Sequence, residues 1–210
     1  MADKEILIFV EGPSDKVFLE AYLYFLEDIP IKNFKVKDVT GKDNLSTKRL
    51  LEIEKYDKTL IIFDADKDYE SNKKEILKVV SKTKQTISEE QIFLFPNNQD
   101  DGDLETLLLE IAKYDEFLKC FEGYLECIKN KEHYKPIKNI RKNMLYAYLE
   151  VFGLENLTKT DGKDKIKEKH KEEYEKLKEV IDFSLNSLIP LKNFLGQFAE
   201  NNQKTNLKIF

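Results

Sequence analysis

The first hundred residues alternate between short apolar runs and segments in which apolar residues recur at helical spacing. Runs such as EILIFV and TLIIFD predict strands at 5–10, 34–39, 59–64 and 91–95. The spacing between them predicts helices at 16–28, 44–56 and 70–82. This order predicts an α/β fold with a mainly parallel, four-stranded sheet that is covered by helices on both faces.

Beyond Pro96 only helical spacing is found. The expected helices lie at 104–120, 137–153, 163–183 and 188–198. We therefore expect an α/β domain over residues 1–118 and a helical C-terminal extension over residues 119–210 that packs on it.

Composition is typical of a globular protein of 210 residues, of which 41% are hydrophobic. No apolar run is long enough to cross a bilayer, and the N-terminal MADKEILIFVEG lacks the pattern of a signal peptide. These features favour a cytoplasmic location. Cys120 and Cys127 are too few for a disulfide framework or a zinc site, so we expect two buried thiols.

The formal net charge of −5 provides no overall attraction to nucleic acid, but it leaves room for a local basic surface. The stretch KNKEHYKPIKNIRK, residues 129–142, carries six Lys or Arg residues against one Glu. Such clusters bind phosphate backbones by releasing counterions. Lys138, Arg141 and Lys142 are thus candidate nucleic-acid contacts, and an exposed basic loop is the alternative.

Acidic residues follow the third expected strand in the segment LIIFDADKD. If the extended backbone continues, Asp64, Asp66 and Asp68 share one face, where their repulsion requires a positive charge such as a divalent cation. The alternative is an ordinary acidic surface turn. Glu11 follows the first strand and should lie at the same carboxyl edge, where ligands of parallel sheets gather.

Two motifs in this order resemble the TOPRIM domain of topoisomerases, primases, OLD-family nucleases and small stand-alone relatives. They are FVEGPSD and IIFDADKD, and the later FPNNQDDGDLETLLLE resembles the stand-alone group. The resemblance covers roughly residues 5 to 110. It implies that Glu11, Asp64 and Asp66 organise Mg²⁺ or Mn²⁺ for chemistry at phosphodiester bonds, with Glu11 as ligand or as general acid or base.

Other residues carry weaker expectations. Glu105 is a candidate ligand for a second metal through its place in GDLE, and its alternative is to complement the dipole of a helix. Lys42, in VTGKDNL, and Lys67 are candidate phosphate contacts or simply solvated lysines. Asp15 is expected at a helix start, and Asp68 in solvent. Two departures from the family pattern, Pro13 in place of a frequent Lys and no Gly after the second motif, affect substrate contacts.

The favoured function is a metal-dependent nuclease acting on DNA or RNA. The chain has no ATPase motif, so a likeness to multi-subunit nucleases implies a separate ATPase partner. One alternative is a phosphatase of the haloacid dehalogenase type. In that family the nucleophilic Asp is also the first residue of an Asp-x-Asp pair that follows an apolar strand. Another is a regulatory module that binds metal or nucleic acid without turnover.

Overall fold

Four parallel strands form the centre of the computed structural model, which describes residues 6–26, 34–39, 45, 53, 55–82, 87–154 and 171–199. The strands are β1 (Ile6–Val10), β2 (Phe34–Asp38), β3 (Lys58–Asp64) and β4 (Ile92–Phe95). Their order in the sheet is β2-β1-β3-β4, and each neighbouring pair is parallel. The predicted α/β fold with a parallel sheet is confirmed.

Helices surround the sheet and make up most of the described residues in the second half of the chain. They are α1 (Pro13–Phe25), α3 (Tyr69–Val80), α4 (Leu104–Glu110), α5 (Asp115–Lys129), α6 (Ile140–Val151), α7 (Lys171–Val180) and α8 (Ile189–Gly196), with short 3₁₀ turns η2 (Glu89–Gln91) and η5 (Asn186–Leu188). Most of the helix expected at 44–56 lies outside the described residues.

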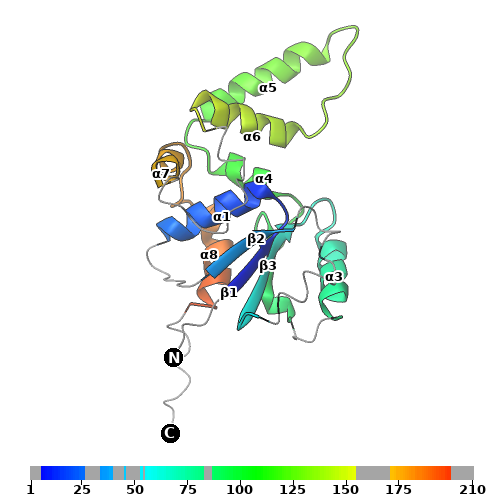
Figure 1. Ribbon diagram of the computed structural model, residues 1–210. Helices are drawn as coiled ribbons and strands as arrows, with labels where there is room; N and C mark the ends of the chain where they lie inside the picture. Colours follow the sequence, from blue (N-terminus) through cyan, green and yellow to red (C-terminus); the bar gives the residue numbers. More distant parts are fainter. Residues whose placement is uncertain are drawn as a thin grey trace.

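Both faces of the sheet are buried, because side chains alternate between them along each strand. In β1, Ile8 belongs to a core shared with α1, α4, α6, α7 and α8, whereas Phe9 belongs to the core on the α3 side. Figure 1 shows α1 and α8 on one side of the sheet and α3 on the other. The C-terminal helices α7 and α8 thus share the larger core with the strands.

The helix expected at 104–120 is two helices, and backbone pairing explains the break. Between α4 and α5, the carbonyl of Ile111 accepts the Asp182 N–H at 2.8 Å, and Lys113 N–H donates to the Val180 carbonyl at 2.9 Å. These bonds leave the helical pattern for a bridge between Ala112 and Ile181. The contact depends on a segment about seventy residues away, which helical spacing does not reveal.

Helices α5 and α6 and the connection between them form an arm, residues 115–151, that stands away from the sheet (Figure 1). The boundary expected between residues 118 and 119 falls inside α5. Cys120 and Cys127 are exposed on this helix, so the prediction of two buried thiols was wrong. The reason is that α5 buries none of its side chains completely.

Within the described residues, no helix has both the length and the apolar character needed to span a membrane.

Tyr148 ties the base of the arm to the body. Its hydroxyl donates to the carbonyl of Val180 at 2.7 Å and accepts the N–H of Tyr114 at 3.3 Å, and its side chain is buried. Tyr148→Phe leaves both backbone groups without this partner, so we expect the free energy of unfolding to fall by about 1–3 kcal/mol. Urea denaturation measures the change. Tyr24→Phe, at an exposed tyrosine of α1, should change it by less than about 0.5 kcal/mol.

Candidate functional site

Four carboxylates converge at the carboxyl edge of the sheet. Glu11 follows β1 directly, and Asp64 is the last residue of β3. Asp15 and Glu105 lie in the first turns of α1 and α4. The charges of Asp15, Glu11 and Glu105 all raise the pKa of Asp64. The sheet edge therefore gathers acids from four segments, as expected for Glu11 and Asp64 and beyond expectation for Asp15.

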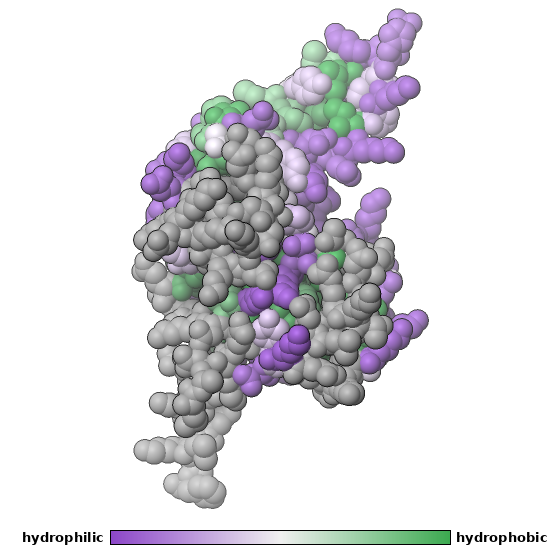
Figure 2. Space-filling view, viewed as in Figure 1, coloured by the Kyte–Doolittle hydropathy of each residue, from purple (hydrophilic) through white to green (hydrophobic). Residues whose placement is uncertain are grey.

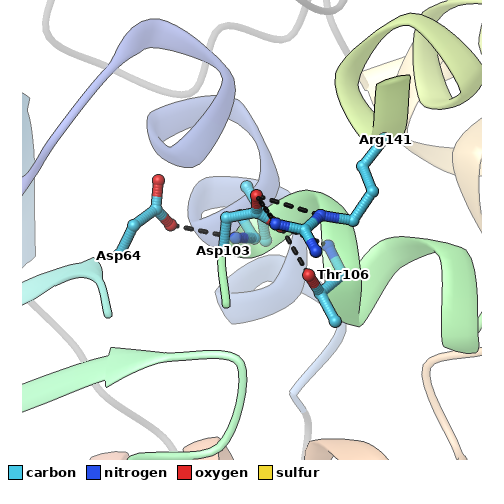
Figure 3. Close-up of polar contacts among 5 residues, drawn as sticks. Asp64, Asp103, Thr106 and Arg141 are labelled. Atoms are coloured by element: carbon cyan, nitrogen blue, oxygen red, sulfur yellow. Dashed lines mark hydrogen bonds and ion pairs between the residues drawn. The ribbon is translucent and has the colours of Figure 1, made fainter. Parts of the chain in front are cut away.

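Asp64 is held in place by the helix that follows β4. Its Oδ1 accepts the N–H of Leu104, the first residue of α4, at 2.9 Å (Figure 3). Burial raises the pKa of Asp64 well above its ordinary value, and the neighbouring carboxylates raise it further, while the Leu104 N–H lowers it. The site therefore makes ionisation of Asp64 less favourable than in water, and a nearby cation would offset this.

Asp15 is the functional candidate that sequence reasoning placed only at a helix start. Its Oδ2 accepts the N–H of Gly12 at 2.7 Å, and its side chain is buried. Burial raises the pKa of Asp15 to about 7; the Gly12 N–H lowers it, and the charges of Glu105 and Glu11 raise it. Its position, one helical turn after Glu11 with only Gly-Pro-Ser between them, was the signal available in the sequence.

Gly12 lies between these two acids, where there is little space for a side chain. A Cβ atom at this position would lie 3.1 Å from Oδ2 of Asp15, the same oxygen that the Gly12 N–H contacts. A side chain here would therefore press on the carboxylate that the turn positions.

Positive charge reaches the cluster from the arm. Burial raises the pKa of Glu105 and Asp103 raises it further, whereas the charges of Lys142 and Arg141 on α6 lower it. The pKa of Lys142 is itself raised: burial lowers it, but Tyr146, Glu105 and Asp15 raise it by more. Glu105, a predicted ligand, thus lies within the electrostatic reach of both the acids and the arm.

The Asp-x-Asp pair does not present two carboxylates on one extended face. The strand ends at Asp64, and Asp66 has a left-handed backbone with φ of 55°. Its backbone forms an antiparallel bridge with Gly102, through N–H to carbonyl distances of 2.7 and 2.8 Å, and its side chain is exposed. The extended backbone that would have placed Asp64, Asp66 and Asp68 on one face therefore does not continue past Asp64, and Asp68 is exposed, as expected. Asp68 caps α3, where its side chain accepts the N–H of Ser71.

Gly102 allows the loop after β4 to pass close to the site. Its φ is 145°, and an added Cβ atom would lie 3.0 Å from Cδ of Pro96. Only glycine fits this backbone and this space. The bridge from Gly102 to Asp66 and the bond from Leu104 to Asp64 together fix the loop against the end of β3.

Arg141, on α6, contacts the loop that follows β4. Its guanidinium donates to Oδ2 of Asp103, from Nη2 at 2.9 Å and from Nε at 3.3 Å (Figure 3). The other oxygen of Asp103 caps α4 by accepting the Thr106 N–H at 2.8 Å and the Thr106 hydroxyl at 2.6 Å. Arg141, a predicted nucleic-acid contact, thus positions the arm over the turn that holds Asp64 and Glu105.

The remaining predicted phosphate contacts are spread along the surface. Lys67 is exposed beside the loop of Asp66, and Lys138 is exposed in the connection that precedes α6. Lys142 is exposed as well, with its Nζ 5.6 Å from the centre of the Tyr146 ring. Lys42 lies outside the described residues. Of this set, Lys142 is the residue that the pKa shifts place within reach of the acids.

The residues fit a hard divalent cation by their chemistry. Asp64 and Asp15 each use one oxygen for a backbone N–H, which orients the second oxygen for another ligand, and Oε2 of Glu11 is buried among them. Within the described residues, no three such side chains already surround one metal position. Mg²⁺ does not require such a cage, since it keeps several waters and is commonly held by one or two carboxylates. Glu11, Asp64 and Asp15, with Glu105 beside them, are the residues that would hold it.

Comparison with known proteins relates the chain to one family. No curated protein and no solved structure matches it. The model of a family described as "Protein of unknown function (DUF3226)" matches residues 5–199, which include the whole sheet and all four acids. The chain therefore belongs to the DUF3226 family.

Proposed function

We propose that this protein is a metal-dependent phosphodiester enzyme acting on nucleic acid, in the manner of a TOPRIM-type nuclease. The observation that carries the proposal is the gathering of three acids, the buried Asp15 and the half-buried Glu11 and Asp64, at the carboxyl edge of a parallel sheet. A folded protein gains nothing in stability from crowding like charges in this way. Groups with strongly perturbed pKa values that cluster at such an edge are typical of functional sites.

The carboxylate oxygens are suited to Mg²⁺ or Mn²⁺, which would polarise a bound phosphodiester and stabilise the charge that develops on its oxygens. In this proposal Asp64 and Glu11 hold the cation, and the backbone N–H of Leu104 keeps the Asp64 carboxylate in position. Asp15 and Glu105 complete the negative surface around it. Asp66 is exposed at the rim and is a candidate for contact through water.

Nucleic acid would approach between the acids and the arm. Lys142 lies near Glu105 and Asp15, and its Nζ is close to the Tyr146 ring, whose hydroxyl lies 3.3 Å from the hydroxyl of Ser14. A cation and an aromatic ring beside a metal site provide contacts for a phosphate and for a base or sugar. Lys138 and Lys67 would extend these contacts, and Arg141 would contribute mainly by holding the arm.

The nuclease proposal predicts metal-dependent cleavage that needs the acids at the sheet edge. Glu11→Gln and Asp64→Asn should each lower the cleavage rate by about 100-fold or more, because even groups that only support a metal ligand contribute about 10- to 100-fold. Cleavage of labelled single- and double-stranded DNA and RNA is measured with Mg²⁺, Mn²⁺ or EDTA. Glu110→Gln, at the exposed C-terminal end of α4, is the matched control and should retain activity.

The same assay separates the alternatives. Binding of nucleic acid without cleavage by folded protein, under every metal tested, would indicate a regulatory module or a subunit that needs its ATPase partner. Hydrolysis of p-nitrophenyl phosphate that Asp64→Asn abolishes, without cleavage of nucleic acid, would indicate a phosphatase.

Protonation and metal binding should compete at the cluster. In EDTA, the pKa of Asp15 is about 7 in the folded protein and about 3.8 in the unfolded chain. Between these values the folded state keeps a proton that the unfolded chain has released, so the free energy of unfolding should fall as the pH rises and level off above pH 7. For Asp15→Asn the fall between pH 5 and pH 7 should be smaller, by up to about 1.4 kcal/mol per pH unit.

Urea denaturation at pH 5, 6 and 7 measures this difference, with Asp57→Asn, at an exposed acid before β3, as the control. Mg²⁺ should stabilise the wild type more at pH 7 than at pH 5, because the cation replaces the proton. Parallel pH curves for wild type and Asp15→Asn, with no stabilisation by Mg²⁺, would contradict the proposed metal site.

Nucleic-acid binding by the arm should follow counterion release. Lys142→Gln should weaken binding and reduce the slope of log K against log salt concentration by about 0.7 to 0.9, the value of one phosphate contact. Fluorescence anisotropy in EDTA, which prevents cleavage, measures the slope. Lys119→Gln is the control, since Lys119 is on α5 and forms an ion pair with Asp115 at 2.6 Å. Equal slopes for all three proteins would place the nucleic acid elsewhere.

A further inference from the structure

The arm presents an apolar surface that the described residues cover only in part. Four of its large hydrophobic side chains are exposed, and they are Phe117, Tyr124, Ile140 and Val151. Phe152, which follows α6, packs on Phe117 and on the exposed Tyr114 at the base of the arm. Figure 2 shows apolar residues gathered along this arm between charged ones. Helices of this length owe most of their stability to packing of an amphipathic face, yet α5 has no fully buried residue.

Two parallel series of uncharged residues run along α5, each with the 3-4-3 spacing of a helix-packing seam. The first series is half-buried, and it consists of Leu118, Phe121, Leu125 and Ile128. α5 contacts α6, and Leu118, at the start of this series, packs against the larger core. The second series is exposed, and it consists of Phe117, Cys120, Tyr124 and Cys127. We call this second series the outer seam of α5.

The outer seam leaves side chains and backbone of α5 accessible to another helix. Tyr124 is 53% exposed and both cysteines are exposed, whereas Phe117, at the base of the seam, is 37% exposed and has one side of its ring against Phe152, with 5.2 Å between the ring centres. Gly123 lies beside Tyr124, and no atom lies within 4 Å of the position of an added Cβ atom there. A helix can therefore approach the backbone of α5 closely at its midpoint, next to a large aromatic ring.

We propose that the outer seam binds the outer seam of a second copy of this chain, with the two α5 helices antiparallel. A two-fold axis between Gly123 and Tyr124 makes the surface complementary to itself. Each Tyr124 ring then packs on Gly123 of the other copy, and each Cys120 faces Cys127 of the other copy. The arms of the two copies together form a four-helix bundle around a shared apolar centre.

Charge favours a second copy as the occupant. α5 carries four acids and two lysines, with Asp115 and Glu116 at its base, and Lys129 and Lys131 lie at the far end of the arm. An antiparallel pair places the acidic base of one arm beside the basic end of the other, so that Glu116 lies near Lys131 of the second copy.

Sedimentation velocity of the full chain over a range of concentrations tests the association. The wild type should form dimers, and Tyr124→Lys should raise the dissociation constant at least about tenfold, because it places a charge at the centre of the interface. Glu122→Lys is the matched control, on the charged side of the same helix, and should change the constant by less than about threefold. A chain that remains a monomer at every concentration, or a dimer that Tyr124→Lys leaves intact, overturns the proposal.

Crosslinking tests the antiparallel register. A short bismaleimide joins two thiols by adding each to one maleimide ring, and no oxidant is needed. Cys120→Ser and Cys127→Ser each keep one thiol and should give little crosslinked dimer alone, whereas their mixture should give abundant crosslinked dimer. Crosslinking of either variant with itself at the level of the mixture indicates another register and overturns the antiparallel pairing. The result does not depend on catalytic activity, so it stands apart from the nuclease proposal.

Discussion

The cost of removing carboxylates from water governs the carboxyl edge of this sheet. Asp15 is buried and Asp64 is half-buried, next to Glu11 and Glu105, and removal from water is the largest contribution to their raised pKa values. Each acid is partly compensated by a backbone N–H, from Gly12 and from Leu104. The turn after β1 and the start of α4 can therefore be understood as supports for these two carboxylates.

The need to hold the Asp64 carboxylate in place explains the conformation of the loop between β4 and α4. Gly102 adopts a backbone that only glycine tolerates, pairs with Asp66 and brings Leu104 to Asp64. Asp103 caps α4 with one oxygen and accepts Arg141 with the other. Caps of this kind contribute about 1 kcal/mol, and a partly exposed ion pair contributes about 0–1 kcal/mol. Neither is large, but both act on the segment that positions Asp64 and Glu105.

The arm connects this edge to the rest of the surface. Its base is held by Tyr148, and α6 carries Arg141 and Lys142 toward the acids. Its outer helix, α5, is the least buried helix in the described part of the chain and is the one with a second apolar seam. The arm thus brings positive charge to the acids through α6 and presents an apolar surface on α5. Association through the outer seam would leave Lys142 facing the acids, because the seam and Lys142 belong to different helices.

Local pattern in the sequence was enough to predict the strands, their parallel arrangement and the meeting of Glu11 with Asp64. Apolar runs indicate burial on both faces of a sheet, and the order of strands and helices implies that the strand ends share one edge.

Tertiary structure alone decided which acids lie together at this edge. Asp66 leaves the face because its backbone turns left-handed to pair with Gly102, and Asp15 joins it because α1 begins over the sheet edge. The break after α4, the engagement of Arg141 by Asp103 and the exposure of Cys120 and Cys127 likewise depend on how distant segments pack. Periodicity describes one element at a time, whereas these contacts join residues tens of positions apart.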